Sequence, residues 1–587
     1  MKRLVYPLAI LVAVFACGGG RRDFVDDTWS FGVDAGTDGN EAPVVSCEDA
    51  VMCSRDLRSV VDACDESRVL ETCAPTDGCA EGKCVPACDA AVGANASTGC
   101  EFVALPPARQ FQTIGSCFAV FLANTWGIPT HIEAEYAGSP LDVVKSTRIV
   151  RTEGSKITYE PFEGELHPGE VGVVFLSQQP SAMSSTACPE GIEAAVARDT
   201  ELTGTRRGET FRIKTSAPVS AYSIYPFGGV SSAIPTASLL IPTAAWKMDY
   251  VITNPWRTLR QASHTFMPTT QIVAAEDDTE IVVSPSVHVH GGPDVEAAER
   301  GSSKTYRLRR GEQIQFSQDE ELTGTRIASN KNVGVWTGHS CMFIPDGSCC
   351  CESSQVELFP LRSWGREYVA IPHISRRFNE VSEEYLYRVT GAVDGTVLTY
   401  EPHRPKDAPP FLAAGESRLF MTQEPFVVKS QDSEHPFAVY AYMTGSGFSG
   451  AQGQDGDPEF TTVIPTEQYM DRYVFFVDPT YPNSQLIVVR SRQEGKPFEP
   501  VVLDCAGPLE DWTPVGTAGT YEYARIWLTK GDKPQAVASG TCGAGRHEIE
   551  SKGPIGVTVW GTGLAASYAY PGGAALRTIN AVEAVVK

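Results

Sequence analysis

The chain has 587 residues, too many for one hydrophobic core and enough for several. It is acidic: 48 lysines and arginines stand against 72 aspartates and glutamates, a formal net charge of −24. That charge argues against binding to nucleic acids or to anionic membranes, because both attract cationic surfaces. The 53 glycines and 40 prolines favour short strands and many turns over long helices.

The first 17 residues have the pattern of a bacterial lipoprotein signal peptide. A cationic start, Met1 to Arg3, precedes a twelve-residue, largely apolar stretch that ends at Phe15. Twelve residues are too few to span a bilayer, so we expect a signal peptide rather than a transmembrane helix. The end of the stretch resembles a lipobox with Cys17 as the lipidated residue, and an ordinary cleaved signal is the alternative. Without Cys17, 16 of the 17 cysteines remain, an even number for pairing.

Residues 18–46 are rich in glycine and aspartate and have no hydrophobic periodicity, which predicts a flexible tether. Residue 18 is glycine and not aspartate, as in lipoproteins that Gram-negative bacteria sort to the outer membrane. We therefore expect a protein of the outer membrane, anchored by lipid alone and exposed at the cell surface.

Residues 47–100 contain eight cysteines and little else that a fold would bury. This density predicts a disulfide-rich module, with a zinc site as the alternative. Export and the lack of nearby histidines favour disulfides. The eight are Cys47, Cys53, Cys64, Cys73, Cys79, Cys84, Cys88 and Cys100.

A Pro-x3-aromatic-x3-Tyr frame occurs three times in the rest of the chain, at intervals of 118 and 105 residues. Repeats of this length indicate modules with a common order of strands. Because the same aromatic positions recur in every copy, we interpret them as core residues and not as a platform for carbohydrate. The three copies are Pro242, Trp246, Tyr250; Pro360, Trp364, Tyr368; and Pro465, Tyr469, Tyr473.

Short β-branched and aromatic segments with turns between them recur about seven times in each module. Residues 271–284 and 387–400 each have an acidic or glycine-containing turn at their centre, which predicts hairpins. A second hairpin is expected at the Gly-acid pairs, such as Gly311-Glu312, and a third between residues 325–329 and 333–336. One short helix is predicted at residues 190–198, after a proline.

These patterns predict an all-β protein with four tandem β-repeat modules behind the N-terminal disulfide-rich module. The repeats span residues 101–587 and form either a propeller-like ring or an array of β-sandwiches. Residues 100–105 and 570–581 are expected to complement each other, which favours the ring. The approximate modules are 101–240, 241–345, 346–450 and 451–587.

The remaining cysteines are interpreted as structural. We expect two pairs, Cys117 with Cys188 and Cys505 with Cys542. Four more cysteines share one loop, where either two local bridges or a metal cluster with His339 is possible, and export favours the bridges. The four are Cys341, Cys349, Cys350 and Cys351.

The sequence contains no nucleophile elbow, zinc-protease helix or phosphate-binding loop motif. His288 and His290 lie on the same side of a predicted strand, and Asp455, Asp457 and Glu459 form an oxygen-rich stretch. An exposed loop and a solvated turn are the favoured interpretations, with a metal ion as the alternative in each case. The sequence therefore predicts a non-enzymatic protein without catalytic residues, metal or cofactor.

Three segments, residues 337–341, 357–360 and 363–369, resemble the N-terminal domain of IgGFc-binding proteins, and Gly311-Glu312 and residues 329–333 fit the same pattern. The resemblance covers most of residues 101–587. The von Willebrand D-type repeats of the animal proteins are absent, and the lipobox and tether are similar to those of the family's lipoproteins in bacteria such as myxobacteria. The resemblance implies adhesion to an extracellular glycan or protein, and no particular ligand. The alternatives are a self-associating component of the surface matrix and a secreted glycan-active enzyme.

Overall fold

The computed structural model describes residues 50–586, except residues 66, 154–155, 180–185, 233, 262–263, 349 and 494. The signal peptide with Cys17, the tether, Cys47 and Cys349 lie outside the described residues. None of the described helices is long and apolar enough to cross a membrane. The longest of them has eight residues, and the predicted all-β class is confirmed.

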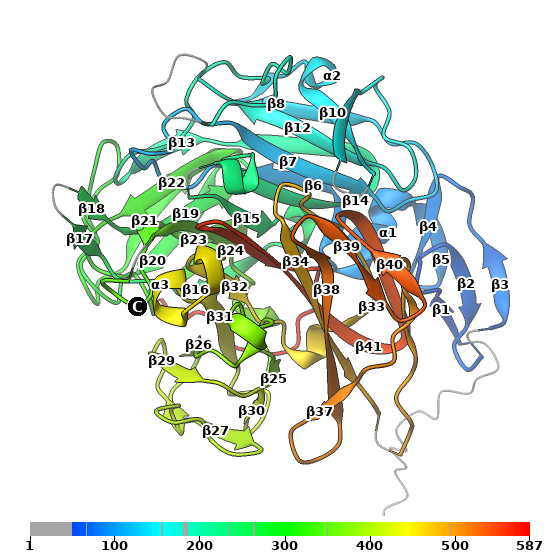
Figure 1. Ribbon diagram of the computed structural model, residues 1–587. Coiled ribbons are helices and arrows are strands. Elements are labelled where there is room, and N and C mark those ends of the chain that lie inside the picture. The colour runs from blue at the N-terminus through cyan, green and yellow to red at the C-terminus, as the bar shows by residue number, and fades with distance from the viewer. Residues whose placement is uncertain are drawn as a thin grey trace, which may run out of the picture. The chain divides into compact units, whose positions relative to one another are not determined.

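The disulfide-rich module consists of a three-stranded sheet, a hairpin and one helix (Figure 1). Three disulfide bonds hold these elements: Cys53–Cys79, Cys73–Cys84 and Cys88–Cys100. The elements are β1 (Val51–Cys53), β2 (Ser59–Asp62), β3 (Val69–Thr72), β4 (Asp77–Ala80), β5 (Lys83–Pro86) and α1 (Ala87–Ala94).

The third repeat shows the common plan most simply, because it is a sandwich of two separate four-stranded sheets. One sheet has the order β25-β30-β27-β28 and the other β29-β26-β31-β32, with antiparallel neighbours throughout. The strands are β25 (Glu367–Ala370), β26 (Tyr385–Gly391), β27 (Thr396–Glu401), β28 (Phe411–Leu412), β29 (Ser417–Thr422), β30 (Phe426–Ser430), β31 (Phe437–Met443) and β32 (Glu459–Thr462).

The second repeat follows the same plan, but one long strand, β23, replaces the pair β30 and β31. The first half of β23 pairs with β16 and β20, and its second half pairs with β19 and β24. The strands are β16 (Lys247–Val251), β17 (Leu259–Gln261), β18 (His264–Phe266), β19 (Pro268–Ala274), β20 (Thr279–Ser284), β21 (Lys304–Leu308), β22 (Glu312–Ser317), β23 (Arg326–Met342) and β24 (Glu352–Glu357).

In the first repeat the long strand is β14. The strand directly before it, β13, joins the second repeat by pairing with β22. The elements are β6 (Thr98–Ala104), β7 (Phe118–Asn124), β8 (Ile132–Tyr136), β9 (Ser139–Pro140), α2 (Val143–Ser146), β10 (Thr147–Glu153), β11 (Lys156–Pro161), β12 (Val171–Ser177), β13 (Arg206–Glu209), β14 (Phe211–Tyr225) and β15 (Thr236–Leu239).

In the fourth repeat the long strand is β41, which pairs with β33 and β35 before its bend and with β34 and β42 after it. The strands are β33 (Met470–Val477), β34 (Asn483–Ser491), β35 (Val501–Leu503), β36 (Gly507–Pro508), β37 (Thr513–Val515), β38 (Tyr521–Lys530), β39 (Lys533–Val537), β40 (Gly540–Cys542), β41 (Gly545–Gly563) and β42 (Ala566–Pro571).

The predicted hairpins in the second and third repeats are wrong, although their strands and turns are present. β19 and β20 flank the turn at Asp277-Asp278, but each pairs with other strands. The same holds for β26 and β27 around Asp394-Gly395 and for β21 and β22 around Gly311-Glu312. Each turn carries the chain from one sheet to the other, because the apolar faces of both sheets must meet in one core.

Two further predictions differ from the structure. Residues 325–329 and 333–336 are not two strands of a hairpin, because both belong to β23. Residues 190–198 are not helical, and Val196 forms an isolated bridge with Ser177 of β12 instead. Tertiary pairing with an existing strand outweighs a helix propensity that extends over so few residues.

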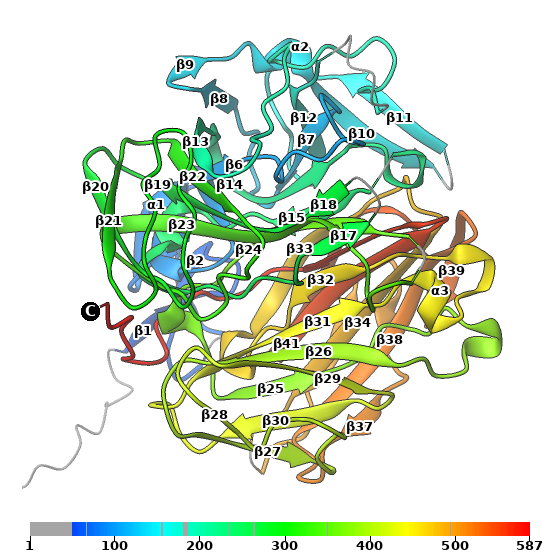
Figure 2. The ribbon, with the colours of Figure 1, turned by 90° about the vertical axis from the view of Figure 1, so that its left-hand side faces the viewer.

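The four sandwiches close into a ring. Its inner strands are β15, β24, β32 and β42; β15 contacts both β24 and β42, and β32 also contacts both. Figure 1 shows β15, β24 and β32 gathered at the centre, and Figure 2 shows the same strands from the side. The predicted pairing of residues 100–105 with 570–581 is not present, because β6 pairs with β14. The C-terminal segment instead meets the end of the disulfide-rich module, where Ser97 N donates to Ala574 O at 2.9 Å and Leu576 N to Asn95 O at 2.6 Å. The arrangement is therefore a propeller-like ring whose units are sandwiches.

Candidate functional site

The recurring aromatic frame is structural. In each copy a short 3-10 turn separates the proline from the first aromatic residue, which is buried, and the final tyrosine lies on the strand that follows. Each tyrosine hydroxyl donates to a backbone carbonyl: Tyr250 to Val333 O at 2.8 Å, Tyr368 to Phe437 O and Tyr473 to Ile555 O at 2.5 Å each. The turns are η2 (Thr243–Ala245), η3 (Leu361–Ser363) and η6 (Thr466–Gln468).

The cysteine loop after β23 forms a disulfide and not a metal cluster with His339. Cys341 is bonded to Cys351, and Cys350 is also disulfide-bonded. The ring of His339 is buried, with Nε2 at 3.1 Å from Arg257 O and Nδ1 at 3.1 Å from Cys341 N. Burial lowers the pKa of His339 to about 4, so the ring is neutral and both nitrogens are occupied.

The other candidate metal ligands do not converge. His288 lies 3.1 Å from Glu299 and His290 lies 3.3 Å from Glu320, all four exposed to solvent. The carboxylate of Asp455 accepts from Asn483 at 3.0 Å. No metal-sized group in the described residues includes these histidines or the Asp455, Asp457 and Glu459 carboxylates.

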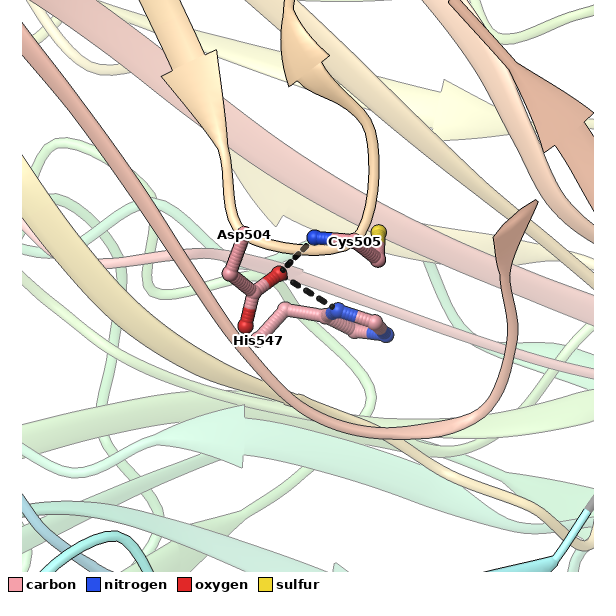
Figure 3. A group of neighbouring side chains, drawn as sticks. All are labelled: Asp504, Cys505 and His547. Carbon is pink, nitrogen blue, oxygen red and sulfur yellow. Dashed lines mark hydrogen bonds and ion pairs between the residues drawn. The ribbon is translucent and has the colours of Figure 1, made fainter. Parts of the chain in front are cut away.

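One group in the described residues has metal-like spacing, and sequence reasoning did not find it. Asp504 and Cys505 directly follow β35, and His547 lies on β41; Figure 3 shows the three side chains together. Cys505 is bonded to Cys542, so its sulfur is not a thiolate. The Nδ1 of His547 lies 3.0 Å from Asp504 Oδ1, and its Nε2 lies 2.8 Å from Gly543 O. Both ring nitrogens are occupied, and the group is a structural Asp–His pair.

The described cysteines are thus all in disulfides. Cys117 is bonded to Cys188 and Cys505 to Cys542, the two long-range pairs that the spacing suggests. Cys64 is disulfide-bonded as well. Within the described residues no cysteine is left as a free thiol.

A groove at the junction of the disulfide-rich module with the first and fourth repeats is the best candidate for a binding surface. We call it the basic groove. One wall comes from the loop after β1 and from α1, the other from β33 and the bend of β41, and the C-terminal segment lies along it. Its residues include Arg55, Asp56, Trp126, Asp471, Arg472, Tyr473, Lys552 and Arg577.

Four cations and two carboxylates line the basic groove. Arg55 Nε lies 3.3 Å from Asp471, and Arg472 Nε lies 2.6 Å from Glu548. Lys552 and Arg577 are exposed, and within the described part of the chain no carboxylate pairs with either. Two cations without a carboxylate partner, in a chain of net charge −24, give the groove a local positive charge that suits an anionic group.

A cation–aromatic pair forms one end of the groove. The guanidinium carbon of Arg58 lies 4.0 Å from the centre of the Trp126 ring, and the indole Nε1 donates to Pro75 O at 3.2 Å. Trp126 is buried, so the pair joins the disulfide-rich module to the first repeat.

No pattern in the sequence indicates the groove. Arg55 lies about five hundred residues before Lys552 and Arg577 in the chain, and closure of the ring brings it to them. Each cation alone is an ordinary surface residue, so only the three-dimensional arrangement distinguishes them.

Comparison with known proteins gives one match. The family model described as IgGFc binding protein matches residues 236–561, which is 326 of 587 residues. No curated protein and no solved structure matches the chain. The matched region includes β33 and Lys552 of the basic groove, whereas Arg55, Trp126 and Arg577 lie outside it.

Proposed function

Because the chain belongs to the IgGFc-binding protein family, we propose that it binds an extracellular protein or glycan at the cell surface, without a catalytic step. The family is one of binding domains and not of enzymes. A rigid ring of sandwiches with disulfides suits this role, because a preformed surface loses little entropy on binding.

The observation that carries the proposal is the basic groove. Lys552 and Arg577 are unpaired cations between walls that a buried tryptophan and disulfides hold in place. Charge complementarity selects an anionic ligand, such as an acidic or sulfated glycan or an acidic face of a protein, and speeds its association. The family match covers only one wall of the groove, so the ligand depends on this chain's own disulfide-rich module.

We further propose that the protein is a lipoprotein of the outer membrane, anchored through Cys17. The cationic start, the apolar stretch and the residue pair Cys17-Gly18 support this location. Lipid at residue 17 and the polar segment up to residue 46 would display the ring away from the membrane.

The experiment that tests the function is an array screen with oxidised residues 18–587. The array carries neutral and acidic glycans, mucins, immunoglobulin Fc and bacterial exopolysaccharide. We expect saturable binding to one anionic class, lost in Lys552→Glu/Arg577→Glu. The matched control is Arg404→Glu/Lys406→Glu, which makes the same charge change on exposed residues of the third repeat. Absence of binding to every class would contradict the proposal.

A further inference from the structure

The four sandwiches share one edge position. In each repeat one strand begins the path of pairing that leads through the sheet to the innermost strand of the ring: β12, β22, β29 and β38. In the third repeat this sheet runs β29-β26-β31-β32, and Figure 1 shows these strands in succession from the periphery to the centre.

In three repeats a further strand covers this edge. β10 pairs with β12 through Thr147–Ile149, β13 pairs with β22 through Arg206–Glu209, and β37 pairs with β38 through Thr513–Val515. All three pairings are antiparallel and only three or four residues long. The covering strands come from different places in the chain, so the edge itself, and not a particular loop, is the common feature.

The third repeat has an open edge at this position. β29 pairs with β26, and in the described part of the chain no other strand pairs with it. No further backbone hydrogen bond reaches residues 418–421 there. Leu419 is 37% exposed, and Arg418 is exposed with Glu416 as its partner at 2.7 Å.

β29 also lacks the usual protection of an edge. Natural edge strands carry proline, lysine or a bulge that prevents further pairing. The sequence Ser-Arg-Leu-Phe-Met-Thr has neither proline nor lysine, its one charged side chain, Arg418, is paired with Glu416, and its register with β26 is unbroken. This six-residue edge, uncovered where its three counterparts are covered, is a site for one more antiparallel strand.

We propose that this strand is β29 of a second copy of the chain, so that two sheets join as one across a two-fold axis. Antiparallel pairing centred on Phe420 sets Leu419 opposite the partner's Met421 and Arg418 opposite the partner's Thr422. Within residues 418–422, the span that pairs, apolar side chains meet and no like charges face each other. In this register Glu416 comes opposite the partner's Glu424, which limits the pairing to that span. An isologous contact of this kind closes as a dimer.

The charge around β29 also permits contact between copies. Residues 401–424 hold three basic and four acidic side chains, so this region is nearly neutral although the whole chain carries −24. Repulsion between two copies is therefore weak at this segment. The seven are Glu401, Arg404, Lys406, Asp407, Glu416, Arg418 and Glu424.

Sedimentation of oxidised residues 18–587 over a range of concentrations tests the dimer. We expect the mass to rise from one chain toward two and amide exchange in residues 418–421 to slow as the dimer forms. A single-chain mass at every concentration up to about 1 mM, the weak end of specific association, would overturn the proposal.

A matched pair of variants tests the location. Leu419→Lys/Met421→Lys places charges on the edge and is expected to abolish the dimer. Val397→Lys/Phe411→Lys makes the same chemical change at exposed, cross-strand positions of the other sheet, 51% and 64% exposed. This control is expected to dimerise like the wild type. Loss of the dimer in both variants, or in neither, would overturn the assignment to β29. Binding to the array shows that each variant is folded.

Discussion

Trp246 donates its indole hydrogen to Glu357 Oε1 at 2.7 Å, across 111 residues of chain. The other carboxyl oxygen accepts from Ile241 N at 2.8 Å. Glu357 lies on the inner strand β24, while Ile241 follows the inner strand β15 of the first repeat. One buried carboxyl thus ties the aromatic frame of the second repeat to the junction between two sandwiches.

Trp246→Phe is expected to destabilise the fold by about 1–3 kcal/mol beyond the loss of ring area, because Glu357 Oε1 loses its donor in a buried site. The control is Trp364→Phe, in which the same ring change removes a longer bond of 3.2 Å to the carbonyl of Phe359. Urea unfolding of both variants measures the difference. A loss in Trp246→Phe no larger than in Trp364→Phe would contradict this role of Glu357.

Tyr473→Phe tests the recurring tyrosine. Its hydroxyl donates to Ile555 O at 2.5 Å and accepts from Met470 N at 2.9 Å, so the variant leaves a buried carbonyl and a buried amide without partners. We expect a loss of about 1–3 kcal/mol in the free energy of unfolding. Tyr159→Phe, at a half-buried ring, is expected to change it by less than about 0.5 kcal/mol. Similar effects of the two changes would refute the interpretation.

Much of the fold follows from local patterns, which reveal strands and turns but not partners. The turn at Asp277-Asp278 was predictable because aspartate tolerates the backbone angles of a turn, and Asp278 has a φ of 52°. Whether the chain returns to the same sheet or crosses to the other depends on what the apolar faces bury. That is a tertiary property, and the hairpin predictions at Asp277-Asp278, Asp394-Gly395 and Gly311-Glu312 failed for this reason.

The site was less predictable than the fold. The burial of Trp246 and Trp364 could be inferred, because every copy of the frame repeats their position. The basic groove could not be, because Arg55 and Arg577 approach each other only when the chain ends close the ring. The open edge of β29 could not be either, since its recognition requires comparison with three covered edges.

Asp478 is expected to make stability depend on pH. Burial raises the pKa of this carboxyl from 3.8 to about 6, and its Oδ2 lacks a partner among the described residues. Between about pH 4 and pH 6 the unfolded chain ionises while the folded chain keeps the proton, so stability falls as pH rises, by about 3 kcal/mol. Burial raises the pKa of Asp457 to about 6 as well, so denaturation across this range should show a shallower slope in Asp478→Asn than in the wild type.

Asp504→Asn is the control for that experiment, because the pKa of Asp504 is shifted in the opposite direction and its effect on stability has the opposite pH dependence. Burial alone would raise the pKa of Asp504, but the hydrogen bond and charge of His547 lower it overall. This group therefore stabilises the fold above its unfolded pKa and loses that contribution as pH falls. If removal of Asp478 leaves the slope between pH 4 and pH 6 unchanged, its assignment as the titrating group is wrong.

Cys17→Ser tests the anchor. Without the thiol no lipid can be attached, so incorporation of labelled fatty acid should be lost and the protein should leave the membrane fraction. Fractionation and labelling of cells that express the two forms measure this directly. Unchanged labelling in Cys17→Ser would show that the lipidated residue lies elsewhere.

The most direct test of the central claim is a titration of the array-identified ligand against the wild type, Lys552→Glu/Arg577→Glu and Arg404→Glu/Lys406→Glu. The basic-groove account predicts that the first double variant weakens binding at least tenfold, about 1.4 kcal/mol. It also predicts that salt weakens wild-type binding and that the second variant binds within about twofold of the wild type. Equal weakening in both variants, or none in either, would show that the ligand does not bind in the groove.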